Sequence, residues 1–469
     1  MATQQLERLE AETAIPSLRG PALFGNFLDY RRDPIAFYMG LGRSGDITSY
    51  RMLTAPVVFI NEPQLIQSLL VEHAADYDKG KLQRYLFRPL VGNGLVNSEG
   101  LFHQSQRKLL APAFQPRHLS AYADTMVAYA DRWQVRWADG AAFNIHAEMM
   151  RLTMDVVSKV LLGADVSGDA DALSAAINTA VHWFQYATTS LIPTPLWAPT
   201  PTNLRTTCAI ALIKRKVRGI IAARQGSRRS GDDVEGRGDL LTMLLSARDA
   251  DGAAMDDGQI LDEVLTFFVA GHETTALALS WSFYLLVRHP DAAARLYAEV
   301  DAALGGHLPT YADLPRLPYT LQVLKEALRL YPPSSAILRV ALRDTVLEDG
   351  QGRRYPIREG AAVVFSQYVL HRRPDYFPDP ERFDPERFDP ERFRPDAERA
   401  LPRYAYLPFG AGHRVCIGSH FATMEGHLLL ATIARTLRFT LAEPATLVAP
   451  ELVLTLRPSR PIMVTATRR

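Results

Sequence analysis

The sequence predicts a mainly helical fold with small β-sheets, built as one domain. Segments of helical hydrophobic period recur along the 469 residues, whereas alternating or short apolar runs are few. No Gly/Ser-rich linker divides the chain. Apolar residues make up 47% of the chain and charged residues 22%, a composition that can bury a large core. We therefore expect residues 1–469 to form a single domain, with 1–20 as a flexible N-terminal segment.

The expected elements follow from periodicity and from the positions of Gly and Pro. A Pro-, Gly- and Arg-rich stretch at 16–36 indicates irregular chain, and alternation over Ile47–Leu53 and Val57–Ile60 indicates a β-hairpin. Four prolines in 191–202 predict a loop, and the run SRRSGDDVEGRGD predicts a flexible one. Helices are expected near 63–74, 101–112, 118–138, 146–162, 170–190, 204–224, 257–289, 291–304, 317–331 and 417–437. Further strands are expected near 336–341, 344–348, 361–365, 452–455 and 461–466.

Charge and cysteine content limit the compartment and the partners. The formal net charge of +1 gives no overall field that would attract nucleic acid or an anionic membrane. The N-terminus is polar, and no window offers the roughly 20 apolar residues that a membrane span needs, so we expect a soluble protein. Because only Cys208 and Cys416 occur, we expect a reducing, cytoplasmic setting, with Cys208 buried in its helix.

The strongest chemical signal surrounds Cys416, in the run PFGAGHRVCIG at 408–418. A thiolate persists only where nearby N–H groups or cations compensate its charge. Gly410 permits backbone conformations that are closed to other residues and lets the chain approach a flat ligand. Cys416 precedes an apolar helix whose first-turn N–H groups favour an anion. Phe409 can limit the access of water to the sulfur, and Arg414 offers donors suited to a carboxylate.

This run resembles the cysteine-ligand loop of the cytochrome P450 family, Phe-Gly-x-Gly-x-Arg-x-Cys-x-Gly, at every fixed position including Gly418. The resemblance implies a haem b whose iron is bound by the Cys416 thiolate, a ligand that favours O–O cleavage. It also implies the family fold, in which the haem lies between a long oxygen-side helix and the cysteine loop. The alternative is a helix-start cysteine without a cofactor. A dinucleotide-binding loop is excluded, because Val415 stands where the third glycine is needed.

The helix expected at 257–289 contains the run AGHETT at 270–275. Ala270 and Thr274 are four residues apart and share one face, and Gly271 beside Ala270 lets a flat macrocycle approach. The Thr274 hydroxyl can hydrogen-bond dioxygen, and Glu273 can relay protons from solvent. The run matches the family motif Ala-Gly-x-Asp/Glu-Thr-Thr/Ser completely. A zinc-protease motif is excluded, because Ala276 stands where its second histidine is needed.

Glu326 and Arg329 lie three residues apart on one expected helical face, and resemble the family's Glu-x-x-Arg pair. By analogy the pair is structural and binds a second arginine from a Pro-Glu-Arg-Phe coil. This chain contains the Pro-Glu-Arg-Phe unit three times, in DPERFDPERFDPERF at 379–393. It therefore has three candidates for the second arginine, Arg382, Arg387 and Arg392. Spacing back from the cysteine favours Arg392, whereas spacing forward from His371 favours Arg387. We prefer Arg392 and leave Arg387 as the alternative.

The same resemblance implies residues around the haem edge and the substrate. His103 and Arg107, one helical turn apart, resemble the propionate-binding pair, and Arg339 resembles a further propionate ligand beside Arg414. An apolar pocket suits a lipophilic substrate. Its expected lining residues are Tyr85, Leu86, Leu95, Phe267, Ala270 and Ile337.

The implied function is a haem-thiolate monooxygenase that inserts one atom of dioxygen into a lipophilic organic substrate. No flavin or iron–sulfur segment is recognisable, so electrons are expected from NAD(P)H through a separate ferredoxin or flavodoxin and its reductase. Basic residues near the cysteine, notably Arg403 and His413, are candidates for the docking face of that partner. Two alternatives stay open: peroxide-driven oxygenation or rearrangement on the same haem, and a non-catalytic haem-binding sensor. The substrate, its site of oxidation and the oligomeric state have no recognisable motif.

Overall fold

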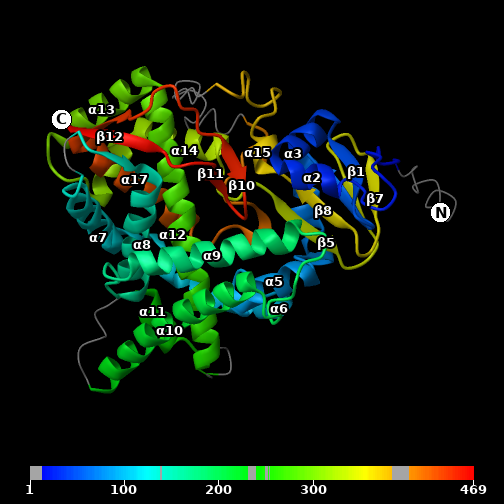
Figure 1. The fold of residues 1–469 in the computed structure, drawn as a ribbon, viewed down its shortest axis with the longest axis horizontal. Helices are drawn as coiled ribbons and strands as arrows, with labels where there is room; N and C mark the ends of the chain where they lie inside the picture. The colour runs from blue at the N-terminus through cyan, green and yellow to red at the C-terminus, as the bar shows by residue number, and fades with distance from the viewer. Residues whose placement is uncertain (1–12, 138–139, 231–238, 249–251, 253, 383–400) are drawn as a thin grey trace, which may run out of the picture. The chain divides into compact units, whose positions relative to one another are not determined.

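The structure, a computed structural model, describes residues 13–137, 140–230, 239–248, 252, 254–382 and 401–469. This part of the chain is mainly helical and carries four small sheets. It forms two compact units, each assembled from segments that are far apart in the sequence (Figure 1). Unit 1 contains the described residues within 1–83, 334–382 and 395–416, and unit 2 contains those within 84–333 and 417–469. The expectation of one single domain stays a prediction.

Unit 1 is organised by a five-stranded sheet of order β1-β2-β8-β5-β3, in which β2 and β8 are parallel and the other neighbours antiparallel. Helix α3 covers one face with Phe37 and Leu41, which pack against Tyr50, Phe59 and other apolar residues of the sheet (Figure 1). β6 and β7 form a separate hairpin. The elements of unit 1 are α2 (Phe27–Arg32), α3 (Pro34–Arg43), β1 (Ile47–Met52), β2 (Ala55–Ile60), α4 (Pro63–Gln67), the π-helical turn η1 (Ser68–Glu72), η2 (Ala74–Asp76), β3 (Tyr77–Asp78), β5 (Ile337–Ala341), β6 (Thr345–Glu348), β7 (Arg354–Ile357), β8 (Ala362–Phe365), α15 (Gln367–Leu370) and η5 (Gly412–Arg414).

Unit 2 is a helical assembly with one large apolar core, a three-stranded sheet of order β4-β12-β9 and the hairpin β10-β11. Helix α5 begins in the last residues of the first segment of unit 1, and most of the helix belongs to unit 2. The elements are α5 (Lys81–Val91), α6 (Gly100–Leu110), η3 (Ala111–Phe114), α7 (Pro116–Gln134), β4 (Ala142–Asn144), α8 (Ile145–Leu162), α9 (Ala170–Thr189), α10 (Pro201–Arg229), α11 (Leu240–Ser246), α12 (Asp257–Arg288), α13 (Pro290–Leu304), η4 (Tyr311–Arg316), α14 (Pro318–Leu330), α17 (Ser419–Thr436), β9 (Leu437–Leu441), β10 (Pro450–Leu452), β11 (Leu456–Pro458) and β12 (Met463–Arg468).

The long helix α12 is the centre of unit 2. The Asp256 side chain caps it by accepting a hydrogen bond from the Gln259 N–H at 2.9 Å, and Pro290 begins the next helix immediately after its end. Because α12 is apolar on nearly all sides, it is buried, and it packs against α8, α14 and α17 (Figure 1). Its Trp281 stacks on Tyr331 at 4.0 Å between ring centroids and donates a hydrogen bond to the Leu456 carbonyl at 3.1 Å.

The expected elements are largely found, and several short elements that were not expected are added, among them β7, β9 and α15. The stretch 16–36, expected to be irregular, contains α2 and the beginning of α3. α5 and α11 were not expected, since Pro89 lies inside α5 and α11 is only seven residues long. The strand expected at 452–455 is a turn, with β10 before it and β11 after it. The loop expected at 191–202 is confirmed, and so is the hairpin of β1 and β2.

A buried ion pair joins three helices of unit 2. Arg224 of α10 donates to both carboxylate oxygens of Asp239, at 2.9 and 2.8 Å, and to the Leu162 carbonyl at the end of α8. Asp239 also caps α11 by accepting from the Thr242 N–H at 2.8 Å. Removing the guanidinium leaves an uncompensated buried carboxylate.

We therefore expect Arg224→Gln to lower the free energy of unfolding by about 3 kcal/mol. The matched control is Lys216→Gln, because Lys216 pairs with Asp169 of the same region on the exposed surface. We expect the control to change stability by less than about 1 kcal/mol. Urea titrations of both variants check this. An equal effect of the two substitutions would contradict the assignment of the Arg224–Asp239 pair as the structural one.

Candidate active site

The cysteine loop of unit 1 depends on two glycines in the left-handed region. Gly410 has φ of 71° and Gly412 has φ of 69°. A Cβ at Gly412 would lie 2.1 Å from the Leu70 carbonyl oxygen of η1, which is too close for any side chain. Glycine is therefore required here both by the backbone angle and by the close approach to η1.

The two ends of the loop are held by hydrogen bonds of its main-chain groups, some to main chain and some to side chains. The Cys416 N–H donates to the Phe409 carbonyl at 2.9 Å, which closes the loop on itself. At its start, the Leu407 N–H donates to Nε2 of His371 at 2.9 Å, and the Gln367 amide donates to the Leu407 carbonyl at 3.3 Å. His371 is fully buried, and its ring lies 5.1 Å from that of Tyr406. Because Nε2 accepts a hydrogen bond, it carries no proton, and this imidazole is neutral.

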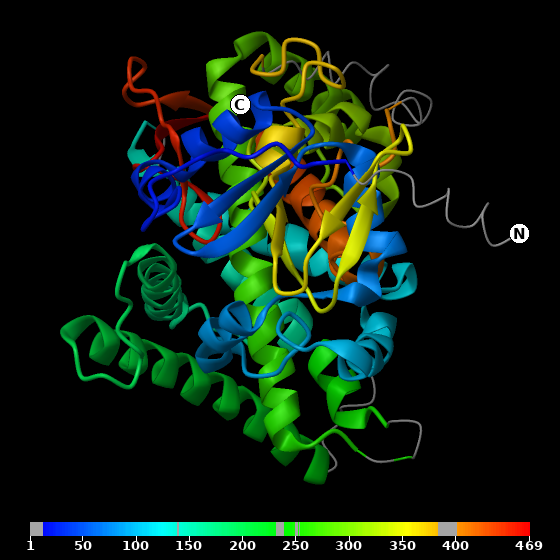
Figure 2. The same cartoon turned by 90° about the vertical axis from the view of Figure 1, so that its right-hand side faces the viewer.

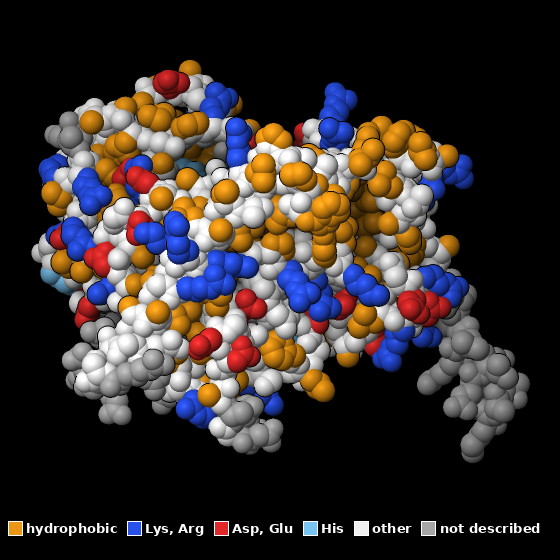
Figure 3. All heavy atoms as spheres, turned by 60° about the horizontal axis from the view of Figure 1, so that its bottom comes forward, with side chains coloured by type: hydrophobic (Ala, Val, Ile, Leu, Met, Phe, Trp, Pro, Cys, Tyr) orange, Lys and Arg blue, Asp and Glu red, His pale blue; other side chains and the backbone are white. Residues whose placement is uncertain are grey.

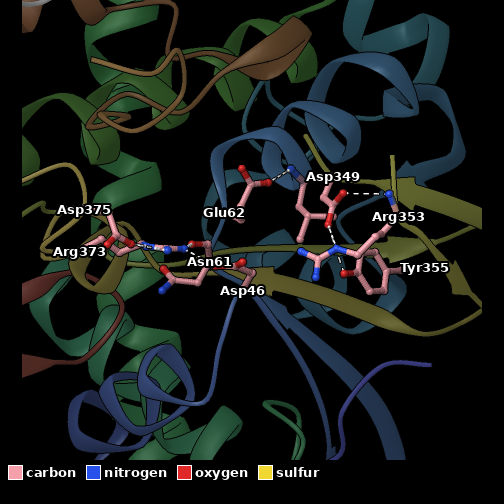
Figure 4. Close-up of polar contacts among 9 residues, drawn as sticks. Asp46, Asn61, Glu62, Asp349, Arg353, Tyr355, Arg373 and Asp375 are labelled. Carbon is pink, nitrogen blue, oxygen red and sulfur yellow. Dashed lines mark hydrogen bonds and ion pairs between the residues drawn. The ribbon is translucent and has the colours of Figure 1, made fainter. Parts of the chain in front are cut away.

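The turn after His371 is anchored to the sheet of unit 1 by the network in Figure 4. Arg373 donates to Asp46, just before β1, at 2.6 Å, and to the Asn61 carbonyl, just after β2, at 2.5 Å. It also binds Asp375 at 2.6 Å. A second group in Figure 4 closes the β6–β7 turn, where Asp349 accepts from Arg353 at 2.6 Å. The Arg373 contacts hold His371, and through it the cysteine loop, on a rigid support.

Cys416 is exposed, and it lies three residues before α17, which begins at Ser419 with Gly418 as its N-cap. The thiol is therefore accessible to solvent. Neither cysteine is in a disulfide. The expectation that Cys208 is buried is wrong: it lies on the solvent side of α10. Periodicity indicated a helix there, but it does not say which side a small apolar residue occupies.

The other expected groups of unit 1 lie near this loop or on its sheet. Arg414 is in η5 and half-buried, two residues before the cysteine. Arg339 is in β5, half-buried, and donates from Nη1 to the Leu338 carbonyl at 2.9 Å. Ile337 of the same strand is the nearest neighbour of Gly410, since a Cβ there would be 3.4 Å from its terminal methyl. Arg403 and His413 are exposed.

On α12 of unit 2, the AGHETT run has an accessible side and a buried side. Ala270 is exposed although most of the helix is buried, and Gly271 and Thr274 are half-buried. The Thr274 hydroxyl donates to the Ala270 carbonyl at 2.8 Å. His272 is fully buried on the α8 side, where its carbonyl accepts from Thr153 at 2.8 Å. Ala270 and Thr274 therefore share the accessible side, as their spacing predicts.

Glu273 is buried and held by a cation that sequence reasoning missed. Arg457 of β11 binds its carboxylate at 2.8 Å through Nε and 2.7 Å through Nη2, and the Thr455 hydroxyl donates to it at 2.5 Å. Arg457 also donates to Asn178 of α9. Burial alone would raise the pKa of Glu273, but the Arg457 charge and the donated hydrogen bonds lower it. The side chain is a clamped carboxylate.

A second buried carboxyl group lies on α17 and was also missed. Glu425 is fully buried beside the Thr275 hydroxyl of α12, and among the described residues neither of its oxygens has a hydrogen bond of good geometry. Burial raises the pKa of Glu425 to about 8, against a smaller opposing effect of Thr275. Glu425 is therefore mostly neutral at pH 7. No local pattern marks it, since only the fold brings α17 against α12.

The Glu326–Arg329 pair of α14 is bidentate and buried. Arg329 donates from Nε at 2.6 Å and from Nη2 at 2.7 Å to the two carboxylate oxygens. Of the three candidate second arginines, Arg382 is exposed, and its backbone N–H donates to the Asp379 carbonyl at 3.0 Å. Arg387 and Arg392 lie outside the described residues, so the choice between them stays a prediction.

His103 and Arg107 lie one turn apart on α6, the first buried and the second half-buried. The apolar residues expected around a substrate are spread over unit 2, apart from Ile337. Leu86 packs with Trp183 and Ala187 of α9, and Leu95 and Phe267 belong to the large core. Tyr85 is exposed. The described contacts therefore leave these pocket assignments as predictions.

The loop that carries Leu95 is fastened to the beginning of α12. Asp262 accepts from the Asn93 N–H at 2.7 Å, and Glu263 accepts from the Leu95 N–H at 2.9 Å. Burial raises the pKa of Glu263 to about 7, against the hydrogen bonds that it accepts. This attachment fixes one of the expected pocket residues relative to the helix that carries Ala270 and Thr274.

The cytochrome P450 family model matches residues 16–466, so the chain belongs to the cytochrome P450 family. It is a monooxygenase of that family, and membership implies a haem. None of the described helices combines the length and the apolarity needed to cross a bilayer.

Relatives with named activities match nearly the whole chain. Cyclooctatin synthase of Streptomyces melanosporofaciens is 37% identical, over 92% of this chain and 91% of the relative. Pentalenene oxygenase of Streptomyces avermitilis is 34% identical, over 95% of each. The solved structure of retinoic acid-bound cyanobacterial CYP120A1 has the same fold, with a TM-score of 0.83, 27% identity, and coverage of 98% of this chain and 100% of that one.

The raised pKa of Glu425 predicts a stability that depends on pH. Because its pKa is about 8 in the folded state and lower when unfolded, the folded state loses relative stability as the pH rises from about 4.5 to about 8. Glutamine does not titrate, so Glu425→Gln removes this loss. Between about pH 5 and about pH 8, we expect the free energy of unfolding of the variant to rise by on the order of 3 kcal/mol relative to that of the wild type.

Urea unfolding at both pH values checks this, with exposed Glu443→Gln as the matched control. A difference between the Glu425 variant and the wild type that is the same at both pH values would contradict a neutral Glu425.

Proposed function

We propose that Cys416 is the thiolate ligand of a haem b, and that the enzyme inserts one atom of dioxygen into a lipophilic organic substrate. The observation that carries this is the cysteine loop. An accessible thiol ends a loop with two left-handed glycines, and one of them, Gly412, packs so close to the Leu70 carbonyl that no side chain fits there. Such a surface suits a flat ligand, and the N–H groups at the start of α17 favour an anionic sulfur.

The donors present fit a haem. The Cys416 thiol has the chemistry to bind iron, and four cationic or imidazole side chains have the chemistry to bind two propionates: Arg339, Arg414, His103 and Arg107. Arginine suits this task, because its planar fork binds a carboxylate with two hydrogen bonds. When bound, the haem supplies the activation of dioxygen. Phe409, Gly410 and Gly418 would shape the loop around the sulfur, and Gly271 with Ala270 would leave space on the oxygen side.

We propose that Thr274 and Glu273 deliver protons. In the present arrangement the Thr274 Oγ1 proton is directed to the Ala270 carbonyl at 2.8 Å, so the hydroxyl must give up this bond to serve a bound ligand. Glu273 must take a proton on Oε1, and the charge of Arg457 at 2.7 Å opposes this. Proton transfer through Glu273 therefore requires the Arg457 pair to loosen. Arg457 acts through Glu273 and is a positioning residue.

We propose further that Glu326 and Arg329 brace the cysteine loop together with Arg392, or alternatively Arg387. The support for this is the burial and the bidentate geometry of the pair, which an ordinary surface ion pair does not have. A guanidinium from the Pro-Glu-Arg-Phe coil would complete the network. The first copy of the coil already contributes one contact, since Glu381 accepts from buried Arg372 at 3.0 Å.

For the substrate we propose a polycyclic terpene-derived hydrocarbon or alcohol, bound by Tyr85, Leu86, Leu95, Phe267, Ala270 and Ile337. Support comes from relatives at 34 to 37% identity whose names specify pentalenene, cyclooctat-9-en-7-ol and cyclooctatin. For the electrons we propose NAD(P)H, a reductase, and a ferredoxin or flavodoxin in the cytoplasm that docks near the exposed Arg403 and His413. Electrostatic docking of this kind weakens with salt.

Thiolate ligation is tested by the absorption of the reduced, carbon monoxide-bound protein. We expect the red-shifted Soret band of the family in the wild type and its loss in Cys416→Ser, because a serine hydroxyl is a much weaker acid than a thiol and cannot supply a thiolate. Cys208→Ser is the matched control and should leave the band unchanged, since Cys208 lies on the surface of α10. A band that persists without Cys416, or is absent from folded, haem-loaded wild type, would refute the proposal.

The role of the Arg457–Glu273 ion pair is tested by the pH dependence of coupling, which is the amount of product formed per NAD(P)H consumed. The assay uses a surrogate ferredoxin system and the apolar compound that gives the largest spin-state shift. In Arg457→Gln, the effect of burial on Glu273 is opposed less, because the hydrogen bond from Thr455 remains but the guanidinium charge is lost, so the pKa of Glu273 rises. Coupling should then show an ionisation that lies at higher pH than any Glu273 ionisation of the wild type, with higher coupling on its acid side.

The double variant Glu273→Gln/Arg457→Gln has no carboxyl group to titrate, and the ionisation should vanish in it. If the double variant keeps the pH step, the step belongs to another group and the relay through Glu273 is wrong.

A further inference from the structure

Residues 92–99, which we call the α5–α6 segment, form a turn that is closed by its own hydrogen bonds. The Asn97 N–H donates to the Gly94 carbonyl at 2.8 Å, and the Asn97 amide donates to the Gly92 carbonyl at 2.8 Å. Left-handed glycines stand at both ends, Gly92 with φ of 55° and Gly100, the first residue of α6, with φ of 60°. Because its hydrogen bonds close inside it, the segment can move as one piece about these two glycines.

The main chain of the α5–α6 segment packs directly on the first turns of α12. A Cβ at Gly92 would lie 2.0 Å from the Asp262 carboxyl group. A Cβ at Gly94 would lie 2.2 Å from the Thr266 hydroxyl and 2.4 Å from the Asp262 carbonyl oxygen. In Figure 2 this light-blue chain crosses the lower part of the long green helix α12. Glycine at both positions is therefore what lets the segment lie against the helix.

Two carboxyl groups of α12 hold the segment in this position. Asp262 accepts from the Asn93 N–H at 2.7 Å, and Glu263 accepts from the Leu95 N–H at 2.9 Å. Glu263 is fully buried, and its other oxygen accepts from the Gln259 amide at 2.6 Å. Within the described part of the chain no cation pairs with Glu263. Two hydrogen bonds alone oppose the cost of burying this carboxyl group as an anion.

The charges around Glu263 do not stand in for the missing cation. Burial raises the pKa of Glu263 to about 7, and the negative charge of the neighbouring Asp262 adds to this. On the facing helix α10, burial lowers the pKa of Lys214, while the charge of Asp262 opposes this and that of Arg218 adds to it. Figure 3 shows the side of the molecule with α10 and α11, where acidic and basic side chains are mixed. No field of one sign therefore acts on this corner of unit 2.

We propose that Glu263 is a positioning residue for the substrate pocket, which latches the α5–α6 segment and its Leu95 to α12 while protonated and releases them when it ionises. The neutral acid keeps its carbonyl oxygen as the acceptor for the Leu95 N–H. The anion is stabilised by water, which reaches Glu263 only when the segment is released, so ionisation and release favour each other. The inference rests on the proposed function in one respect, because the place of Leu95 in the pocket belongs to that proposal.

The direction of the pH dependence follows from the two states of Glu263. In the latched state its pKa is about 7, and in the released state it is that of a carboxyl group in water, about 4.3. The state with the lower pKa gains as the pH rises. Between about pH 6 and about pH 9 the ratio of released to latched protein should therefore rise roughly tenfold.

The latch is tested by hydrogen exchange of the main-chain amides in peptides that span the α5–α6 segment. Exchange is measured by mass spectrometry on the haem-loaded protein at about pH 6 and about pH 9, and is corrected for the intrinsic effect of pH. In the wild type we expect the corrected exchange to be roughly tenfold faster at the higher pH. In Glu263→Gln it should be the same at both, because the amide oxygen still accepts from the Leu95 N–H but does not ionise. Asp257→Asn, at an exposed position of the same helix, is the matched control and should keep the wild-type dependence.

A second pair of variants tests the packing of the segment without any titration. Gly94→Ala places a methyl group against the main-chain carbonyl of Asp262, which cannot move aside, so the segment should exchange fast at both pH values. Gly168→Ala adds a methyl group in open space elsewhere in unit 2, and should leave the exchange of the segment unchanged. Far-ultraviolet circular dichroism and urea unfolding verify that each variant is folded.

The link to the pocket is tested by titrating the haem-loaded protein with 1-adamantanol, a polycyclic alcohol that does not ionise in this range, and following the spin state of the iron. Only the latched segment presents Leu95, so the dissociation constant of the wild type should be about twofold or more larger at about pH 9 than at about pH 6. The same increase is expected in Asp257→Asn, and none in Glu263→Gln.

Different results would overturn the latch and its role in the pocket. Corrected exchange that is independent of pH in the wild type, or that keeps its pH dependence in Glu263→Gln, would overturn the latch. A constant dissociation constant, or no spin-state shift with 1-adamantanol, together with the expected exchange, would overturn the role in the pocket. The exchange result does not depend on the reaction: if the carbon monoxide band persists in Cys416→Ser, the proposed function fails while the latch is judged on its own measurement.

Discussion

The contact between Gly412 and the Leu70 carbonyl is the constraint on which the cysteine side of the molecule depends. A Cβ at Gly412 would clash with the Leu70 carbonyl oxygen, and a main-chain group has no rotamers that could make room for it. The packing of η5 on η1 therefore requires glycine at this position. The neutral His371 holds the other end of the loop through the Leu407 N–H, and Arg373 fastens the turn that follows His371 to the sheet. Rigid elements of this kind keep a metal ligand in place without help from the metal.

Two buried carboxyl groups in unit 2 show how one difference in surroundings sets charge. Glu273 and Glu425 are both withdrawn from water, which by itself favours the neutral acid. Arg457 reverses this for Glu273 and keeps it ionised, whereas Glu425 has only a neighbouring hydroxyl and keeps its proton at pH 7. The same helix, α12, carries Glu273 and faces Glu425 through Thr275. An ionised and a protonated carboxyl group thus coexist in one apolar core.

The sequence was enough to predict what is local. The cysteine loop, the AGHETT run on a buried helix, the bidentate Glu326–Arg329 pair and the mainly helical fold all follow from spacing and residue type. It could not predict Arg457, Glu425 or the role of His371, because each acts on a segment far away in the chain. It failed for Cys208, since α10 carries cations on its buried side as well as on its exposed side, and the hydrophobic period is weak there. Arg387 and Arg392 of the repeated coil lie outside the described residues.

Asn203 makes the shape of the α9–α10 connection independent of the side chains that the connection displays. Its amide accepts from the Trp183 indole and donates to the Pro195 and Ala198 carbonyls and to the Thr194 hydroxyl. Residues such as Ile192 and Trp197 can therefore be exchanged for others without altering the path of the backbone. Substitutions at these two positions can therefore change the chemistry of the surface without changing the fold beneath it.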